Sequence, residues 1–199
     1  MSYRPSVRPH DRPRVRAGTG LAVLLPMVLD SPQSPPPEPH PDREQGGFTE
    51  AEKRHTFIRL VFDGDEQRYN AFRQTLADAV PPSTRAIVRG SAVTGTRWKD
   101  QAPFDAEGPG TSDVDLTLVG ADVLAAFTLA GSYIPGVHTR PMGEEDPDIA
   151  PALADLREHL TRLAGRPVNV QASRDWVIAL RGELIGQPYL TLFGDPEDQ

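Results

Sequence analysis

Two aspartates stand two positions apart in residues 113–119, Asp-Val-Asp-Leu-Thr-Leu-Val. Because polar and apolar residues alternate strictly there, the stretch is predicted to be a β-strand with Asp113, Asp115 and Thr117 on one face. The Cα atoms of the two aspartates would lie roughly 6.5 to 7 Å apart, and their carboxylates repel each other unless a cation bridges them. The pattern indicates a Mg²⁺ site completed by phosphate oxygens. The alternative is the solvated face of an edge strand.

A second polar element follows the short apolar strand predicted at residues 85–89, where the chain continues with Gly90 and Ser91. Glycine permits a close approach of the backbone. N–H groups at the start of a helix, together with the Ser91 hydroxyl, can hold a terminal phosphate; the alternative role for Ser91 is a helix cap alone. Three cations lie within reach in the sequence and are candidates for nucleotide binding, namely Arg89, Arg97 and Lys99.

The order strand, Gly-Ser, loop and Asp-x-Asp on a second strand resembles the polymerase β-type nucleotidyltransferase superfamily in its minimal single-domain form. The matching motifs are Ile-Val-Arg-Gly-Ser at residues 87–91 and Ser-Asp-Val-Asp-Leu at residues 112–116, and the resemblance covers about residues 85–172. It implies Mg²⁺-dependent transfer of a nucleoside monophosphate from a nucleoside triphosphate to a hydroxyl acceptor, with loss of pyrophosphate. The Gly-Ser pair would hold the triphosphate, and the two aspartates would ligate the metal.

The spacing of the two motifs departs from the family pattern. Ser91 and Asp113 are 22 positions apart, which is longer than the stretch usual in the family. We interpret residues 98–110 as an insertion beside the site. Its aromatic residues Trp98 and Phe104 either anchor the insertion to the core or stack on a base.

A second departure concerns the third carboxylate of the family, whose matching position here is Asn169, in a strand predicted at residues 166–171. Val168 and Val170 are expected to face the core, so Asn169 should face the site. An amide coordinates Mg²⁺ weakly and cannot act as a general base at neutral pH. Three explanations remain open: the domain only binds nucleotide, transfer is slow, or another group is the base, such as Asp105, Glu107 or Asp175.

Helical and strand patterns along the chain predict the elements that position these residues. The fold class expected is α+β, with a small mixed sheet flanked by helices, nucleotidyltransferase-like. We expect a helix behind a Thr49–Glu52 capping box, then helices at 65–80, 121–127 and 148–164, and a helix from a Ser173 cap to 184. Strands are expected at 85–89, 113–119, 166–171 and 189–193. An irregular loop is expected at 128–147, and it contains His138 and a solvated acidic run at 144–146.

Composition separates the chain into two parts. Ten of its 21 prolines lie in the first 42 residues, which predicts a disordered Pro/Arg-rich tail at 1–47 and a nucleotidyltransferase-like domain at 48–199. The net charge of −7 divides into +1 for the tail and −8 for the domain, so a phosphate-bearing partner should arrive with a divalent cation. The absence of cysteine excludes a disulfide scaffold and a thiolate zinc site.

The leading hypothesis is a cytoplasmic Mg²⁺-dependent nucleotidyltransferase that uses a nucleoside triphosphate and has no membrane partner. Its acceptor, which the sequence leaves open, is a protein, an RNA end or a small molecule. The alternative is a degenerate module that binds nucleotide or a partner, for instance as the antitoxin of a toxin–antitoxin pair, because Asn169 replaces a carboxylate. A third option, an exported binding protein, rests on the short apolar run at 21–29, which is too short to span a membrane.

Overall fold

The capping box predicted at Thr49 begins the first helix of the chain. In the computed structural model, which describes residues 47–184 and 186–194, α1 spans Glu50–Phe62. The Glu52 N–H donates to Thr49 Oγ1 at 3.2 Å, and the Thr49 N–H donates to the Glu52 carboxylate at 2.8 Å. These two bonds satisfy N–H groups that a helix start leaves unpaired, so the predicted capping box is confirmed.

The second helix, α2, spans Glu66–Ala79 and agrees closely with the prediction. The Asp65 carboxylate accepts hydrogen bonds from the N–H groups of Gln67 and Arg68, and the helix ends before the Pro81-Pro82 pair, which cannot continue it. The remaining helical segments are α3 Ser91–Thr94, α4 Ala121–Leu124, η1 Leu129–Gly131, η2 Pro147–Ile149, α5 Pro151–Ala164, α6 Trp176–Ile178 and η3 Ala179–Leu184.

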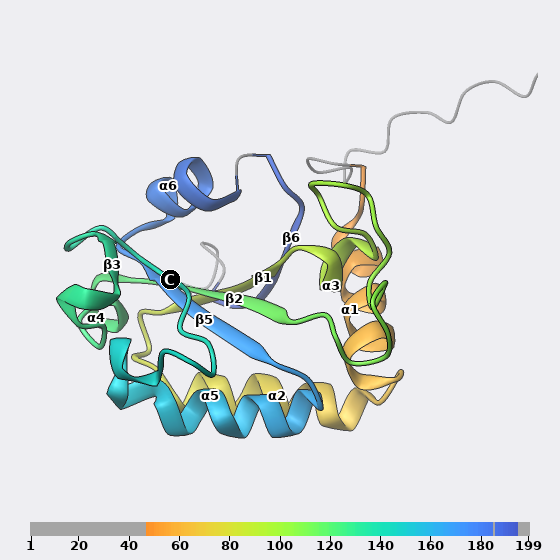
Figure 1. Ribbon diagram of the computed structural model, residues 1–199, viewed down its shortest axis with the longest axis horizontal. Coiled ribbons are helices and arrows are strands. Elements are labelled where there is room, and N and C mark those ends of the chain that lie inside the picture. Colours follow the sequence, from red (N-terminus) through yellow and green to blue (C-terminus); the bar gives the residue numbers. More distant parts are fainter. Residues whose placement is uncertain (1–46, 185, 195–199) are drawn as a thin grey trace, which may run out of the picture. The chain divides into compact units, whose positions relative to one another are not determined.

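One six-stranded mixed sheet carries these helices, with strands in the order β3-β4-β5-β2-β1-β6 (Figure 1). β2 pairs with β5 in parallel, whereas the other neighbours are antiparallel. The strands are β1 Arg85–Arg89, β2 Val114–Val119, β3 Ser132–Ile134, β4 His138–Thr139, β5 Val168–Ser173 and β6 Tyr189–Phe193. Figure 1 shows α2 and α5 along one face of the sheet and α6 on the other. The predicted α+β class, with a small mixed sheet flanked by helices, is confirmed.

Two local predictions are wrong. Residues 128–147, predicted to be an irregular loop, contain the β3–β4 hairpin, which extends the sheet beyond β5. These strands are three and two residues long, so they show no alternation in the sequence and depend on pairing with β5. Ser173 is the last residue of β5 and not a helix cap; Asp175 caps α6 by accepting the Ile178 N–H at 3.0 Å.

The predicted tail at 1–47 lies, except for Gly47, outside the described residues, and so does the apolar run at 21–29. The boundary between tail and domain therefore stays a prediction. Within residues 47–184 and 186–194, no helix has both the length and the apolar character needed to cross a bilayer.

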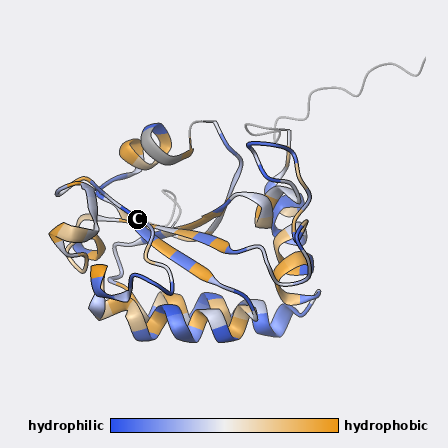
Figure 2. Ribbon diagram, in the orientation of Figure 1, coloured by the Kyte–Doolittle hydropathy of each residue, from blue (hydrophilic) through white to orange (hydrophobic). Residues whose placement is uncertain are grey.

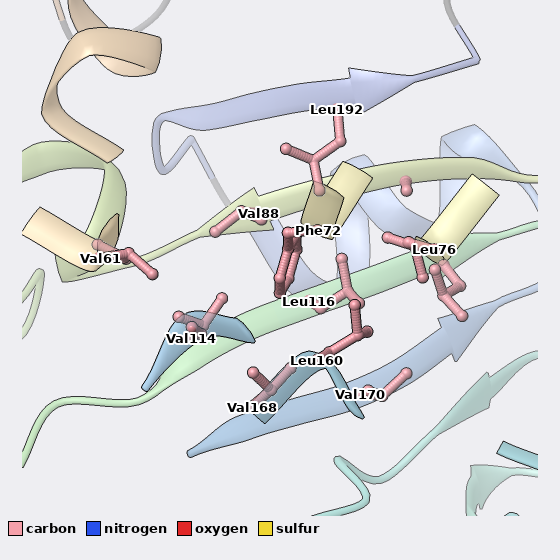
Figure 3. Packing of buried hydrophobic residues seen from close by; sticks show 14 of the residues in the cluster. Val61, Phe72, Leu76, Val88, Val114, Leu116, Leu160, Val168, Val170 and Leu192 are labelled. Carbon is pink, nitrogen blue, oxygen red and sulfur yellow. The ribbon is translucent and has the colours of Figure 1, made fainter. Parts of the chain in front are cut away.

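Alternation in β2 and β5 places one apolar face of the sheet in the core, as Figure 2 shows by the change of hydropathy along both strands. Val114 and Leu116 of β2 and Val168 of β5 are fully buried. They pack with Phe72 of α2 and Leu160 of α5 (Figure 3). This face is the main apolar contact between the sheet and the helices, and it fixes which side chains of β2 point the other way.

An aromatic cluster joins α1 to α2. The Phe57 ring meets Phe62, Tyr69 and Phe72 edge-on, with centroids 5.5, 6.1 and 6.4 Å apart. Phe62 and Phe72 are also edge-on at 5.5 Å. Such pairs add about 0.5–1.5 kcal/mol each to what area burial contributes, so the cluster is a main source of stability for the two helices.

Replacing Phe72 tests this role. We expect Phe72→Ala to lower the free energy of unfolding by about 3–5 kcal/mol, because the ring is fully buried and its removal leaves a cavity. Urea unfolding monitored by circular dichroism measures the change. Leu129→Ala is the control, since Leu129 is 78% exposed and should change stability by less than about 0.5 kcal/mol. Equal effects of the two substitutions would contradict the assignment.

Candidate active site

One row across the sheet collects polar residues from four strands. Arg89 of β1 is opposite Asp115 of β2, and Asp115 is opposite Asn169 of β5. Tyr189 of β6 is opposite Arg89 and extends the row on the other side. Because residues in register share a face of the sheet, these side chains lie on the face opposite the apolar one. The structure therefore brings together Arg89, Asp115 and Asn169 from segments far apart in the sequence.

The next residues of β1, β2 and β5 on this face are buried. Thr117 and Gln171 are opposite each other and buried, and Gln171 Nε2 donates to Thr117 Oγ1 at 2.9 Å. Ile87, opposite Thr117, is fully buried as well. In the first row Asp115 and Asn169 are half-buried, and Asp113, just before β2, is exposed.

Asn169 lies between the two aspartates. Its Nδ2 donates to Asp113 Oδ2 at 2.5 Å, and a hydrogen bond from the same side chain stabilises ionised Asp115. Burial nevertheless raises the pKa of Asp115 above its ordinary value; the Arg89 guanidinium opposes this rise and the neighbouring Asp113 charge adds to it. Burial is therefore the main reason why the charged form of Asp115 is disfavoured.

Gly90 brings the backbone against the same carboxylate. Its φ of 79° lies in the region that favours glycine. A Cβ at this position would lie 3.5 Å from Asp115 Oδ2. Ser91 follows as the first residue of α3 and is half-buried. The predicted Gly-Ser turn therefore lies directly beside the second aspartate.

The three predicted cations have different surroundings. Arg89 lies in the polar row, and its Nε is buried without a hydrogen-bond partner. Arg97, directly before the insertion, pairs with two of its carboxylates, Glu107 at 2.8 Å and Asp100 at 3.4 Å. Lys99 is exposed on the insertion. Across the described residues, neither Arg97 nor Lys99 forms an ion pair with Asp113 or Asp115, so Arg89 is the cation that the fold places at the site.

The three carboxylates considered as alternative bases have structural partners. Asp105 pairs with Arg166 at 3.0 Å. Burial raises the pKa of Asp105, but the Gly110 N–H, Arg166 and the Ser112 N–H outweigh burial and lower it to about 2, which makes Asp105 a weak base at neutral pH. Glu107 pairs with Arg97, and Asp175 caps α6. Each of the three is therefore held by a partner other than Asp113, Asp115 or Asn169.

The two aromatic residues of the insertion differ in burial. Phe104 is partly buried against the core, and the Arg166 guanidinium lies 4.4 Å from its ring centroid, so the anchoring role is confirmed for Phe104. Trp98 is 54% exposed and does not anchor the insertion. His138 pairs with Ser173 at the opposite end of β5 from Asn169, four positions along the strand and therefore about 13 Å away, which excludes direct contact with the carboxylates.

Sequence patterns missed two features beside the site. Met142 and Val170 exchange backbone hydrogen bonds of 2.7 and 3.1 Å, which brings Gly143 so close that a Cβ there would lie 3.2 Å from Asn169 Oδ1. Lys53, buried on α1, lies 5.2 Å from the Tyr189 ring centroid. Neither residue had a local signal, because each reaches the site only through long-range packing.

The donor set fits a hard divalent cation with oxygen ligands. In the described part of the chain no group of three or more acidic or histidine side chains is arranged to hold a metal, so Asp113 and Asp115 are a pair. Rotation of the Asn169 amide by a half-turn would turn its oxygen toward Asp113 in place of Nδ2. Two carboxylates and one amide oxygen, with phosphate oxygens and water, satisfy the preference of Mg²⁺.

Comparisons of the chain with family models, with curated proteins and with solved structures give no match. The resemblance to the polymerase β-type nucleotidyltransferases therefore rests on the two sequence motifs alone.

The raised pKa of Asp115 gives a test of the site without any ligand. Asp115→Asn should raise the melting temperature at pH 7 by a few degrees, because it removes a charge that burial and Asp113 disfavour; about 1 kcal/mol corresponds to ~2–4 °C in a domain of this size. A raised pKa contributes stability at low pH that is lost as the pH rises through it. The gain should therefore vanish as the pH falls below 4.

Scanning calorimetry between pH 3 and 8 in the presence of a chelator measures this effect. Asp155→Asn on α5 is the matched control, because Asp155 is exposed and the substitution makes the same change in charge. A fall in melting temperature for Asp115→Asn at pH 7 would contradict the inference that the folded chain disfavours the charge of Asp115.

Proposed function

We propose that the chain binds a nucleoside triphosphate with Mg²⁺ at the polar row and transfers its nucleoside monophosphate to a hydroxyl acceptor. The observation that carries this proposal is the position of Gly90 and Asn169 on either side of Asp115. The Gly90 backbone, the two carboxylates and the Arg89 cation then lie close together at this polar row.

In this proposal the Gly90–Ser91 turn binds the terminal phosphate of the triphosphate. With no side chain at Gly90, the backbone N–H groups and the Ser91 hydroxyl can approach phosphate oxygens closely. Arg89 precedes the turn, and its buried Nε is a donor available to an anionic group. Lys53, which is buried and paired with Glu50, lies near Tyr189 at the same end of the row.

In this proposal the two aspartates bind the metal. When bound, Mg²⁺ neutralises charge on the phosphate oxygens and polarises the phosphorus for attack. Asp113 and Asp115 supply its anionic ligands, while the Asn169 amide orients Asp113. Burial, with the Asp113 charge added to it, raises the pKa of Asp115, so binding of a cation would relieve a strain that the folded chain carries.

Deprotonation of the acceptor is the weak step of this site. Asn169 cannot take up a proton at neutral pH, and Asp105, Glu107 and Asp175 are held by other partners. We therefore infer slow transfer, with a proton that leaves to water or to Asp115. A triphosphate substrate suits a cytoplasmic location. The acceptor remains a protein, an RNA end or a small molecule with a free hydroxyl.

The amide at position 169 also favours a second candidate, a module that binds nucleotide or a protein partner without turnover, as an antitoxin does. In this alternative the hydrogen bond from Asn169 to Asp113 maintains the folded arrangement where a third carboxylate would add repulsion. Measured turnover by the unaltered protein would exclude this alternative. Nucleotide binding without turnover would support it.

Substitution of the aspartates tests the proposal. The unaltered protein with Mg²⁺ and α-labelled nucleoside triphosphates should bind nucleotide and label an acceptor or release pyrophosphate. Asp113→Asn and Asp115→Asn should each reduce transfer by about 100-fold or more, because a metal ligand supplies several kcal/mol of charge stabilisation. Asp155→Asn controls for the change of charge. The proposal fails if the unaltered protein neither binds nor transfers and the aspartate variants behave alike.

Asn169→Asp restores the carboxylate that the family has. We expect affinity for Mn²⁺, measured by electron paramagnetic resonance, to rise by roughly tenfold or more, since one added charge beside the metal is worth at least ~1.4 kcal/mol. The transfer rate should rise as well. Asn70→Asp, on exposed α2 surface, makes the same charge change outside the polar row. A loss of both affinity and rate in Asn169→Asp would show that position 169 does not serve the site.

A further inference from the structure

Arg166 connects the insertion to α1 and to the start of β2. It is 9% exposed and precedes β5. Its Nη1 donates to Asp105 Oδ1 at 3.0 Å and to the Ser112 carbonyl at 3.1 Å, and its Nη2 donates to the Leu60 carbonyl of α1 at 3.1 Å. The guanidinium also lies over the Phe104 ring. The planar fork of arginine suits three acceptors and a ring at once, which the point charge of lysine does not.

Asp105 completes this contact from the insertion. Its Oδ1 accepts the Ser112 N–H at 2.9 Å and its Oδ2 accepts the Gly110 N–H at 3.0 Å, while its own N–H donates to Ser112 Oγ at 2.8 Å. The backbone of Asp105 is in the left-handed region, with φ 58°. The pKa of about 2 keeps the carboxylate ionised throughout the physiological range. We call Arg166, Asp105 and Ser112 the Arg166 clamp.

The clamp acts on the residue directly before the first aspartate of the site. β2 begins at Val114, so the ladder of the sheet contains Asp115 but not Asp113. Asp113 is exposed and is not held by packing. Its backbone is instead fixed on both sides, at Ser112 by the clamp and at Val114 by an N–H that donates to the Pro167 carbonyl at 2.9 Å.

We infer that the Arg166 clamp positions Asp113 for the metal, with Arg166 and Asp105 as positioning residues and the insertion as the segment that carries them. This inference rests on the proposed function. Metal ligands must be held in place by the groups around them, and loss of such support weakens metal affinity by about 10- to 100-fold. The clamp supplies this support to the backbone of the one aspartate that lies outside the sheet ladder, while Asn169 of β5 contacts its side chain.

Mn²⁺ binding to the full-length protein, measured by electron paramagnetic resonance, tests the clamp. Arg166→Lys keeps the charge but loses the fork, and Asp105→Asn keeps the shape but loses the ion pair. Each should weaken Mn²⁺ binding by about 10- to 100-fold while circular dichroism shows a folded chain. Glu107→Gln is the matched control: it breaks the ion pair with Arg97 in the same insertion without contact to the clamp, and it should leave Mn²⁺ affinity unchanged.

A double-mutant cycle separates positioning from general damage to the fold. In an Asp113→Asn background the clamp variants should cause no further loss of Mn²⁺ affinity, because the ligand they position is already absent. Additive losses would overturn the inference, and so would folded clamp variants that bind Mn²⁺ as the unaltered protein does. If both clamp variants fail to fold, the clamp is required for stability and not for positioning, and the inference is wrong.

Failure of the proposed function has a different signature. If the unaltered protein binds neither Mn²⁺ alone nor Mn²⁺ with a non-hydrolysable nucleoside triphosphate, the metal site itself is wrong and the inference is overturned with it. If the unaltered protein binds Mn²⁺ and the clamp variants bind it equally tightly, the proposed function stands and the clamp has no role in it.

Discussion

The register between β2 and β5 is the constraint on which the site depends. Val114 and Leu116 are buried against the same helices as Val168 and Val170, and a slip by one residue would turn this apolar set toward solvent. The register that buries the valines also places Asp115 opposite Asn169. The hydrophobic core therefore determines the geometry of the polar face, although none of its side chains touches that face.

The polar face combines stability and strain. Behind the site, Thr117 and Gln171 satisfy each other within the buried part of the sheet. At the first row, Asp115 has a raised pKa because burial and Asp113 disfavour its charge. A folded protein retains such a disfavoured charge most readily where a ligand relieves it, and this pairing of strain with function is common at binding sites. The amide of Asn169 reduces the strain by donating to Asp113.

The insertion between the two motifs has a defined structure of its own. Phe104 packs on the core, and Asp105 joins the insertion to Arg166 and Ser112. Sequence patterns marked this segment only as an extra stretch beside the site, because its contacts join residues that are 7 to 61 positions apart. For the same reason, only the structure shows the partners of the three carboxylates considered as bases. Asp105 pairs with Arg166, Glu107 pairs with Arg97, and Asp175 caps the start of α6.

Local sequence alone determined α1 with its Thr49 cap, α2 with its Asp65 cap, and the central strands β1, β2 and β5, because each has a capping residue or a periodic apolar pattern of its own. It also singled out the two aspartates, whereas Asn169 was marked only by the family resemblance. Tertiary structure decided the β3–β4 hairpin, the place of Gly143 beside Asn169 and the link from Arg166 to Ser112. These features are too short to have a pattern, and they form only when distant backbone groups pair within the folded chain.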